Sequence, residues 1–63
     1  MEITRKDDLY QILVSHEELG TLGNCLNEAL ENVDKFEFQT RVGVERSEVK
    51  ILRAQIATAY RGL

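Results

Sequence analysis

The chain has 63 residues, of which 43% are hydrophobic and 30% are charged, and its formal net charge is −3. That length allows one domain, and the composition is typical of a globular chain and not of a disordered one. Because so short a chain has little room for a concave pocket that excludes water, we expect no enzymatic activity. The sequence therefore predicts a single small non-catalytic domain over residues 1–63.

The sequence predicts neither a membrane-spanning segment nor a secretory signal. No run of 18 apolar residues occurs, so no transmembrane helix and no membrane partner are expected. The first residues, MEITRKDD, are too polar for a secretory signal, and a cytoplasmic location is the resulting expectation. The acidic whole does not favour nucleic acid as the main partner. The charge is uneven, however, because residues 15–33 hold four glutamates and no basic residue, whereas residues 45–63 hold four basic residues against two glutamates.

Residues 1–14 are predicted to form a β-hairpin. Lys6-Asp7-Asp8 has turn chemistry, and the stretch from Leu9 to Val14 is rich in residues that favour strands. The second strand would be apolar on both faces, with Tyr10, Ile12 and Val14 on one face and Leu9 and Leu13 on the other. A lone two-stranded ribbon is marginal in water and leaves unpaired edges, so pairing between two subunits is a hypothesis that addresses both problems.

Residues 15–63 are predicted to form three helices, which gives an α+β fold. Ser15-His16-Glu17-Glu18 is an S-x-x-E capping box, and the helix that it opens should end near Asn32. Its apolar stripe consists of Leu19, Leu22, Leu26, Leu30 and Val33. Gly20 and Gly23 lie at this stripe and each costs a helix about 1 kcal/mol relative to alanine, so we expect a close approach by another backbone there.

The second helix is expected from Lys35 to Val42. Asp34 and Glu37 form a D-x-x-E capping pattern at its start, and Gly43 suits the left-handed residue that ends a helix. Phe36 is expected to fill space beneath the hairpin.

The third helix should begin between Glu45 and Ser47 and end near Gly62. Its predicted core stripe is Val49, Leu52, Ile56, Ala59 and Tyr60, with Leu63 as a further candidate.

The stretch from Lys35 to Ala54 resembles a helix-turn-helix. The residues that carry this resemblance are the turn glycine Gly43 and the apolar Phe38, Val42, Val44, Val49 and Leu52. The resemblance implies a DNA-binding regulator. Arg46, Ser47 and Lys50 would then face base edges, and Arg41 and Arg53 would contact phosphates.

A second hypothesis places a protein-binding surface on the last helix. Arg46, Lys50 and Arg53 gather on a face beside the core stripe, and Ile51 points away from that stripe as a candidate exposed anchor. Hydrophobic contact would supply affinity, and the charges would supply orientation. Self-association, as a dimer, is expected because a chain of this length buries a small core and its one cysteine excludes an intrachain disulfide.

These patterns favour a small interaction or regulatory protein that acts as a homo-oligomer, with possible contact to another protein. A helix-turn-helix DNA-binding regulator is one alternative, and an accessory or inhibitory subunit of an enzyme is another. One cysteine and one histidine make no zinc pattern, and no glycine-rich phosphate loop occurs, so no metal or cofactor is expected. Cys25 flanks the leucine stripe and is expected to be a small buried hydrophobic residue, and His16 a surface residue.

Overall fold

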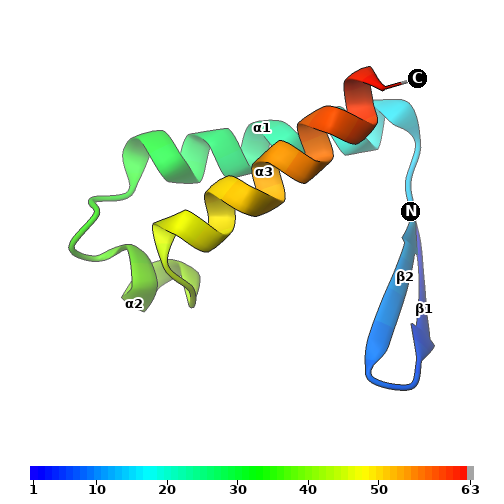
Figure 1. Cartoon of the computed structure of the whole chain (residues 1–63), viewed down its shortest axis with the longest axis horizontal. Helices are drawn as coiled ribbons and strands as arrows, with labels where there is room; N and C mark the ends of the chain where they lie inside the picture. The colour runs from blue at the N-terminus through cyan, green and yellow to red at the C-terminus, as the bar shows by residue number, and fades with distance from the viewer. Residues whose placement is uncertain (63) are drawn as a thin grey trace.

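The structure, a computed structural model, describes residues 1–62, so the candidate stripe residue Leu63 lies outside the described residues. Its elements are β1 (Glu2–Lys6), β2 (Leu9–Leu13), α1 (His16–Asn32), α2 (Phe38–Val42) and α3 (Arg46–Arg61). A two-stranded antiparallel hairpin followed by three helices confirms the predicted α+β class. Helices α1 and α3 lie side by side, with α2 at one end of the pair and the hairpin projecting from the other end (Figure 1). No helix in residues 1–62 is long and apolar enough to cross a membrane.

The hairpin closes through a two-residue loop, Asp7-Asp8. The strands pair from Glu2 opposite Leu13 to Lys6 opposite Leu9. Asp7 adopts a positive φ of 55°, which such short loops require and which aspartate tolerates better than most residues. The side chain of Arg5 donates a hydrogen bond to the carbonyl of Asp7 over 3.0 Å and so braces the loop. The predicted hairpin is therefore confirmed.

The capping box at the start of α1 is also confirmed. The backbone N–H of Glu18 donates to Ser15 Oγ over 3.0 Å, and the N–H of Ser15 donates to Glu18 Oε1 over 2.9 Å. The amino group of Met1 donates to the other carboxylate oxygen, Oε2, over 3.1 Å. Glu18 thus links the start of α1 to Met1, the residue before β1. The Ser15 N–H, followed by the Met1 ammonium, lowers the pKa of Glu18 from its ordinary value of 4.5.

The lowered pKa of Glu18 predicts that this junction weakens in acid. A carboxylate with a depressed pKa in the folded state stabilises that state above pH 4.5, and the stabilisation is lost as pH falls through the lowered value. In an NMR titration we expect the Ser15 amide resonance to move with protonation of Glu18 and to stay still in Glu18→Gln, whose side chain still accepts but does not titrate. In the control variant Glu17→Gln, which changes the exposed neighbour, the Ser15 amide resonance should move with pH as it does in the unaltered protein. An unchanged Ser15 titration in Glu18→Gln would contradict this assignment.

The middle helix starts later than predicted, at Phe38 instead of Lys35. Asp34 Oδ1 accepts from the N–H of Phe36 over 2.8 Å, and the Asp34 carbonyl accepts from the N–H of Glu37 over 2.9 Å. Asp34 therefore stabilises a turn two residues ahead of it, as aspartate commonly does, and the predicted D-x-x-E cap is wrong. The helix ends as predicted at Gly43, which has a φ of +97° and donates its N–H to the carbonyl of Gln39.

The buried core takes one side chain from each helix: Leu30, Phe38 and Val49. Leu26, Ala29, Val33 and Val44 pack around these three. Because the core lies where α2 meets the end of α1 and the start of α3, it joins the three helices at one end of the molecule.

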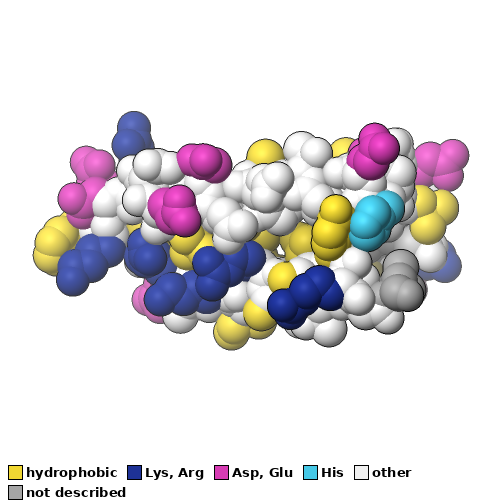
Figure 2. Space-filling view, turned by 90° about the horizontal axis from the view of Figure 1, so that it is seen from above, with side chains coloured by type: hydrophobic (Ala, Val, Ile, Leu, Met, Phe, Trp, Pro, Cys, Tyr) yellow, Lys and Arg dark blue, Asp and Glu magenta, His cyan; other side chains and the backbone are white. Residues whose placement is uncertain are grey.

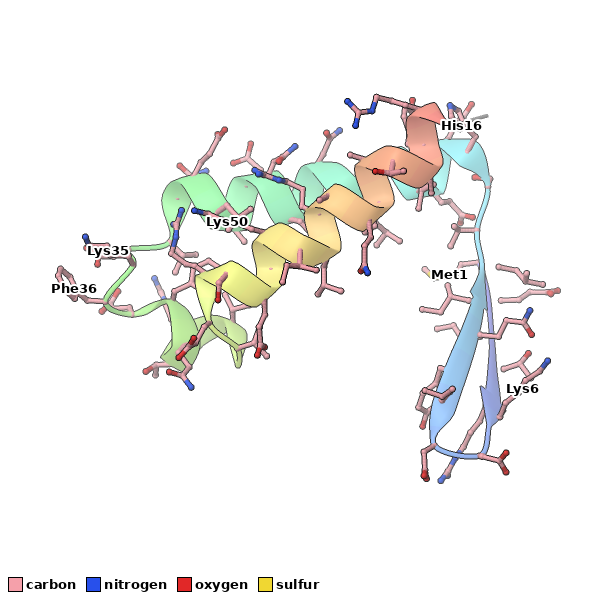
Figure 3. All side chains as sticks on the ribbon, viewed as in Figure 1. Met1, Lys6, His16, Lys35, Phe36 and Lys50 are labelled. Atoms are coloured by element: carbon pink, nitrogen blue, oxygen red, sulfur yellow. The ribbon has the colours of Figure 1, made fainter. Side chains whose placement is uncertain are left out.

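Several apolar residues lie outside this core, contrary to prediction. In the predicted stripe of α3, Ala59 is exposed and Tyr60 is 40% exposed. Leu52 is 48% exposed, because the packing of α3 on α1 leaves the outer edge of its apolar stripe uncovered. Phe36 is 86% exposed and sits at the end of the molecule opposite the hairpin, as Figure 3 shows by the labels of Phe36 and Lys6. It therefore fills no space beneath the ribbon, and its ring lies 5.4 Å from the ammonium of Lys35.

Candidate interaction surface

Of the basic residues predicted on α3, some bind other parts of the described chain and one does not. Arg46 is half-buried, and its Nη1 donates to the backbone carbonyl of Leu30 over 2.7 Å. That carbonyl belongs to the last turn of α1, where carbonyls lack partners within the helix. The guanidinium also lies 5.6 Å from the ring centroid of Phe38. Arg46 therefore ties α3 to α1 with the group that was predicted to meet a partner or a base edge.

The other predicted basic residues are less constrained. Arg53 is half-buried and donates to Asn27 Oδ1 on α1 over 3.3 Å. Arg41 on α2 lies 3.8 Å from Glu37 in an exposed ion pair, a kind of contact worth about 0–1 kcal/mol. Lys50 and Ser47 are exposed on α3. Figure 2 shows Lys and Arg side chains mostly along one long edge of the molecule and Asp and Glu mostly along the other.

Ile51 is 59% exposed, as its position away from the core stripe predicts. It borders a shallow depression on the outer face of α3, which we call the α3 depression and which is lined by Ile51, Ala54, Gln55, Thr58 and Ala59. The neighbours of Ile51 on this face are therefore Ala54, Gln55, Thr58 and Ala59, and none of them is charged.

A groove of about 480 Å³ runs between α1 and α3. It is lined by Leu19, Gly20, Gly23, Asn24, Asn27, Arg53, Ile56, Ala57, Tyr60 and Arg61. A Cβ built on Gly20 would lie 3.0 Å from Cε2 of Tyr60, and one on Gly23 would lie 3.4 Å from Cγ2 of Ile56. The two glycines of α1 are therefore approached closely, but by side chains of α3 and not by a backbone as expected.

The two glycines are expected to respond differently to alanine. Gly23→Ala should raise the free energy of unfolding by up to about 1 kcal/mol, because alanine favours the helix and a 3.4 Å contact is ordinary packing. Gly20→Ala should gain less, because the ring of Tyr60 must move and Tyr60 stacks on His16 at 3.9 Å between ring centroids. Urea denaturation of both variants checks this difference. Equal stabilisation by the two substitutions would contradict it.

The two faces of the hairpin differ because the register places opposite residues on the same face. One face, which we call the ribbon face, carries Ile3 opposite Ile12 and Arg5 opposite Tyr10. The other face carries Glu2 opposite Leu13, Thr4 opposite Gln11 and Lys6 opposite Leu9. Every residue of both strands is exposed. The prediction that β2 has apolar residues on both faces is confirmed. The ribbon face is the more continuous apolar surface, because Ile3 of β1 lies on it.

Residues with chemical reactivity are few in the described part of the chain. No three His, Cys, Asp or Glu side chains of residues 1–62 come together to hold a metal ion. Cys25 is exposed, so the expectation that it is buried is wrong. The buried side of α1 is narrower than predicted and does not extend to Cys25. His16 is exposed as predicted, although its stack on Tyr60 has no signal in the local sequence.

Comparison of the chain with protein-family models, with curated proteins and with solved structures finds no match in any of the three. The function is therefore inferred from the surfaces of the chain itself. Two of these stand out as apolar and uncovered, the ribbon face and the α3 depression.

Proposed function

We propose that this is a small non-catalytic interaction or regulatory protein of the cytoplasm that acts as a homodimer, with the hairpin as its self-association element. The observation that carries the proposal is the extent of the surface. The chain exposes 5331 Å² at a mass of 7.2 kDa. A folded monomer of that mass is expected to expose about 4,100 Å², so about 1,200 Å² are in excess.

The dimensions of the chain support the same conclusion. Its radius of gyration is 12.9 Å, whereas a compact domain of this length is expected to have one of about 11 Å. An interface of standard size buries about 800 Å² on each partner, so the excess surface is enough for a stable dimer. A second copy would therefore bring the exposed area per chain to the range of ordinary folded proteins.

The hairpin is where much of this excess lies. Both strands are exposed along their whole length, and the ribbon projects from the helices (Figure 1). An isolated pair of strands is marginally stable in water, and its edges are open to pairing. Cover from a second copy would remove both weaknesses.

The test is a matched pair of substitutions on adjacent residues of β2. Ile12→Lys places a charge on the ribbon face, and Gln11→Lys places the same charge on the opposite face. Loss of a buried isoleucine removes about 1.5–3 kcal/mol, so the dissociation constant should rise about 10- to 100-fold for Ile12→Lys and little for Gln11→Lys. Sedimentation equilibrium measures both. A folded monomer of the unaltered protein at tens of micromolar would overturn the proposal.

DNA binding is a second proposal, which the turn at Gly43 favours because it leaves Ser47 and Lys50 exposed at the start of α3. Glu45 and Glu48 flank the same turn and would repel phosphate. Gel-shift titration at two salt concentrations separates the two proposals, since DNA affinity falls steeply with salt and an apolar protein contact does not. No shifted band at about 10 μM protein would reject DNA binding.

A further inference from the structure

We infer that the hairpin of each copy lies across α3 of the other copy, with the ribbon face seated on the α3 depression. This inference rests on the proposed homodimer and names its contact surfaces. Within one chain both surfaces are uncovered, because Ile3, Tyr10 and Ile12 on the ribbon and Ile51 on the helix are all more than half exposed. Figures 1 and 3 show the hairpin directed away from the helical pair, so it leaves α3 of its own chain open.

The ribbon face alone does not account for the excess surface. Two strands of five residues present a face of about 17 Å by 10 Å. If the two ribbons covered only each other, a large part of the roughly 1,200 Å² excess would stay exposed, including the apolar side of α3. Docking of the hairpin of one copy on α3 of the other covers the ribbon face and the α3 depression of both copies.

The two surfaces match in length and shape. From Ile51 to Ala59 the helix rises about 12 Å, which a ribbon of about 17 Å spans. The depression exists because Ala54, Thr58 and Ala59 are small, and Ile51 forms one border. A branched or aromatic side chain such as Ile12 or Tyr10 has the bulk to fill a hollow of that kind, and close filling is what protein interiors require.

The charges at the edges of these surfaces fix a direction. Arg5 lies on the ribbon face next to the loop, opposite Tyr10. Glu48 lies one helical turn before Ile51 and is exposed. Pairing of Arg5 with Glu48 would place the loop of the hairpin near the start of α3 and Ile12 near Gln55, because Arg5 and Ile12 are about 7 Å apart along the ribbon and Glu48 and Gln55 are about 10 Å apart along the helix. Opposite charges set orientation more than affinity. Each chain offers one ribbon and one helix face, and in the proposed dimer a two-fold axis forms both contacts at once.

Mixed disulfide cross-linking tests the pairing directly. In a Cys25→Ser background, a chain with Ile12→Cys is mixed with a chain with Gln55→Cys and oxidised mildly. We expect a mixed disulfide between the two chains, identified by mass, and its yield should fall at least tenfold when Gln11→Cys, on the opposite face, replaces Ile12→Cys. Ile51→Lys, made without any cysteine substitution, should raise the dissociation constant of the dimer tenfold or more, as Ile12→Lys does.

The outcomes separate this inference from the proposal beneath it. Self-linking of Ile12→Cys without a mixed product would show face-to-face ribbons, which overturns the inference and leaves the homodimer standing. A dimer that forms no mixed product, or one that links Gln11→Cys equally well, also overturns the inference. A monomeric unaltered protein overturns the homodimer itself. Since Ile12 and Ile51 are exposed in the single chain, circular dichroism should show the variants folded.

Discussion

Replacing Phe38 with alanine is expected to unfold the helical part of the protein at room temperature or bring it close to unfolding. Phe38 is 1% exposed and is one of three buried core residues, with Leu30 and Val49. A Phe→Ala change in a core costs about 3–5 kcal/mol. A domain of 63 residues has a free energy of unfolding of about 3–9 kcal/mol, so the loss removes at least a third of it and, at the lower end of that range, all of it.

The sequence supplies a matched control two residues earlier. Phe36 is 86% exposed, and Phe36→Ala should change the free energy of unfolding by no more than about 0.5 kcal/mol. Urea denaturation followed by far-UV circular dichroism measures both variants under the same conditions. Similar losses at the two positions would mean that the core is not where the structure places it.

The second large effect is expected at Arg46. Arg46→Ala removes the donor to the Leu30 carbonyl and the cation over the Phe38 ring. A hydrogen bond to a charged group contributes about 1.5–3 kcal/mol, so we expect a destabilisation of that size. Thermal and urea unfolding measure the loss. The prediction follows from the role of Arg46 as a link between α1 and α3.

Lys50→Ala is the control for Arg46→Ala. Lys50 lies one turn further along the same side of α3, is exposed, and makes no ion pair or hydrogen bond within residues 1–62. Its removal should cost no more than about 0.5 kcal/mol. If Arg46→Ala left stability unchanged and instead abolished binding to DNA or to a partner, the structural role assigned to Arg46 would be wrong.

Local signals predicted most of the fold correctly. The capping box at Ser15, the loop at Asp7 and Asp8 and the helix end at Gly43 each depend on a few neighbouring residues, and all three are confirmed. The failed cap at Asp34 is also local. The Asp34 side chain accepts from the N–H of Phe36, two residues ahead, and not from the N–H of Glu37, three residues ahead. An aspartate can form either hydrogen bond.

The candidate surface was harder to predict because it depends on contacts between distant residues. Arg46 reaches a carbonyl 16 residues earlier, which no pattern within α3 reveals. Leu52 and Ile56 both belong to the predicted stripe of α3, yet Leu52 is 48% exposed and Ile56 is half-buried. The unequal faces of the hairpin follow from the pairing of Ile3 with Ile12, which could have been found by aligning the two strands across the loop.

The short connection between Leu13 and His16 has a consequence for stoichiometry. A hairpin that binds α3 of a second copy gives a closed dimer only if the hairpin of that copy binds α3 of the first. Otherwise each added copy leaves one hairpin free to bind a further copy. The bend at this connection, which Glu18 holds through Ser15 and Met1, would then decide between a discrete complex and an open fibre. Two chains with identical contact surfaces would thus differ in assembly if only the connection between Leu13 and His16 differed.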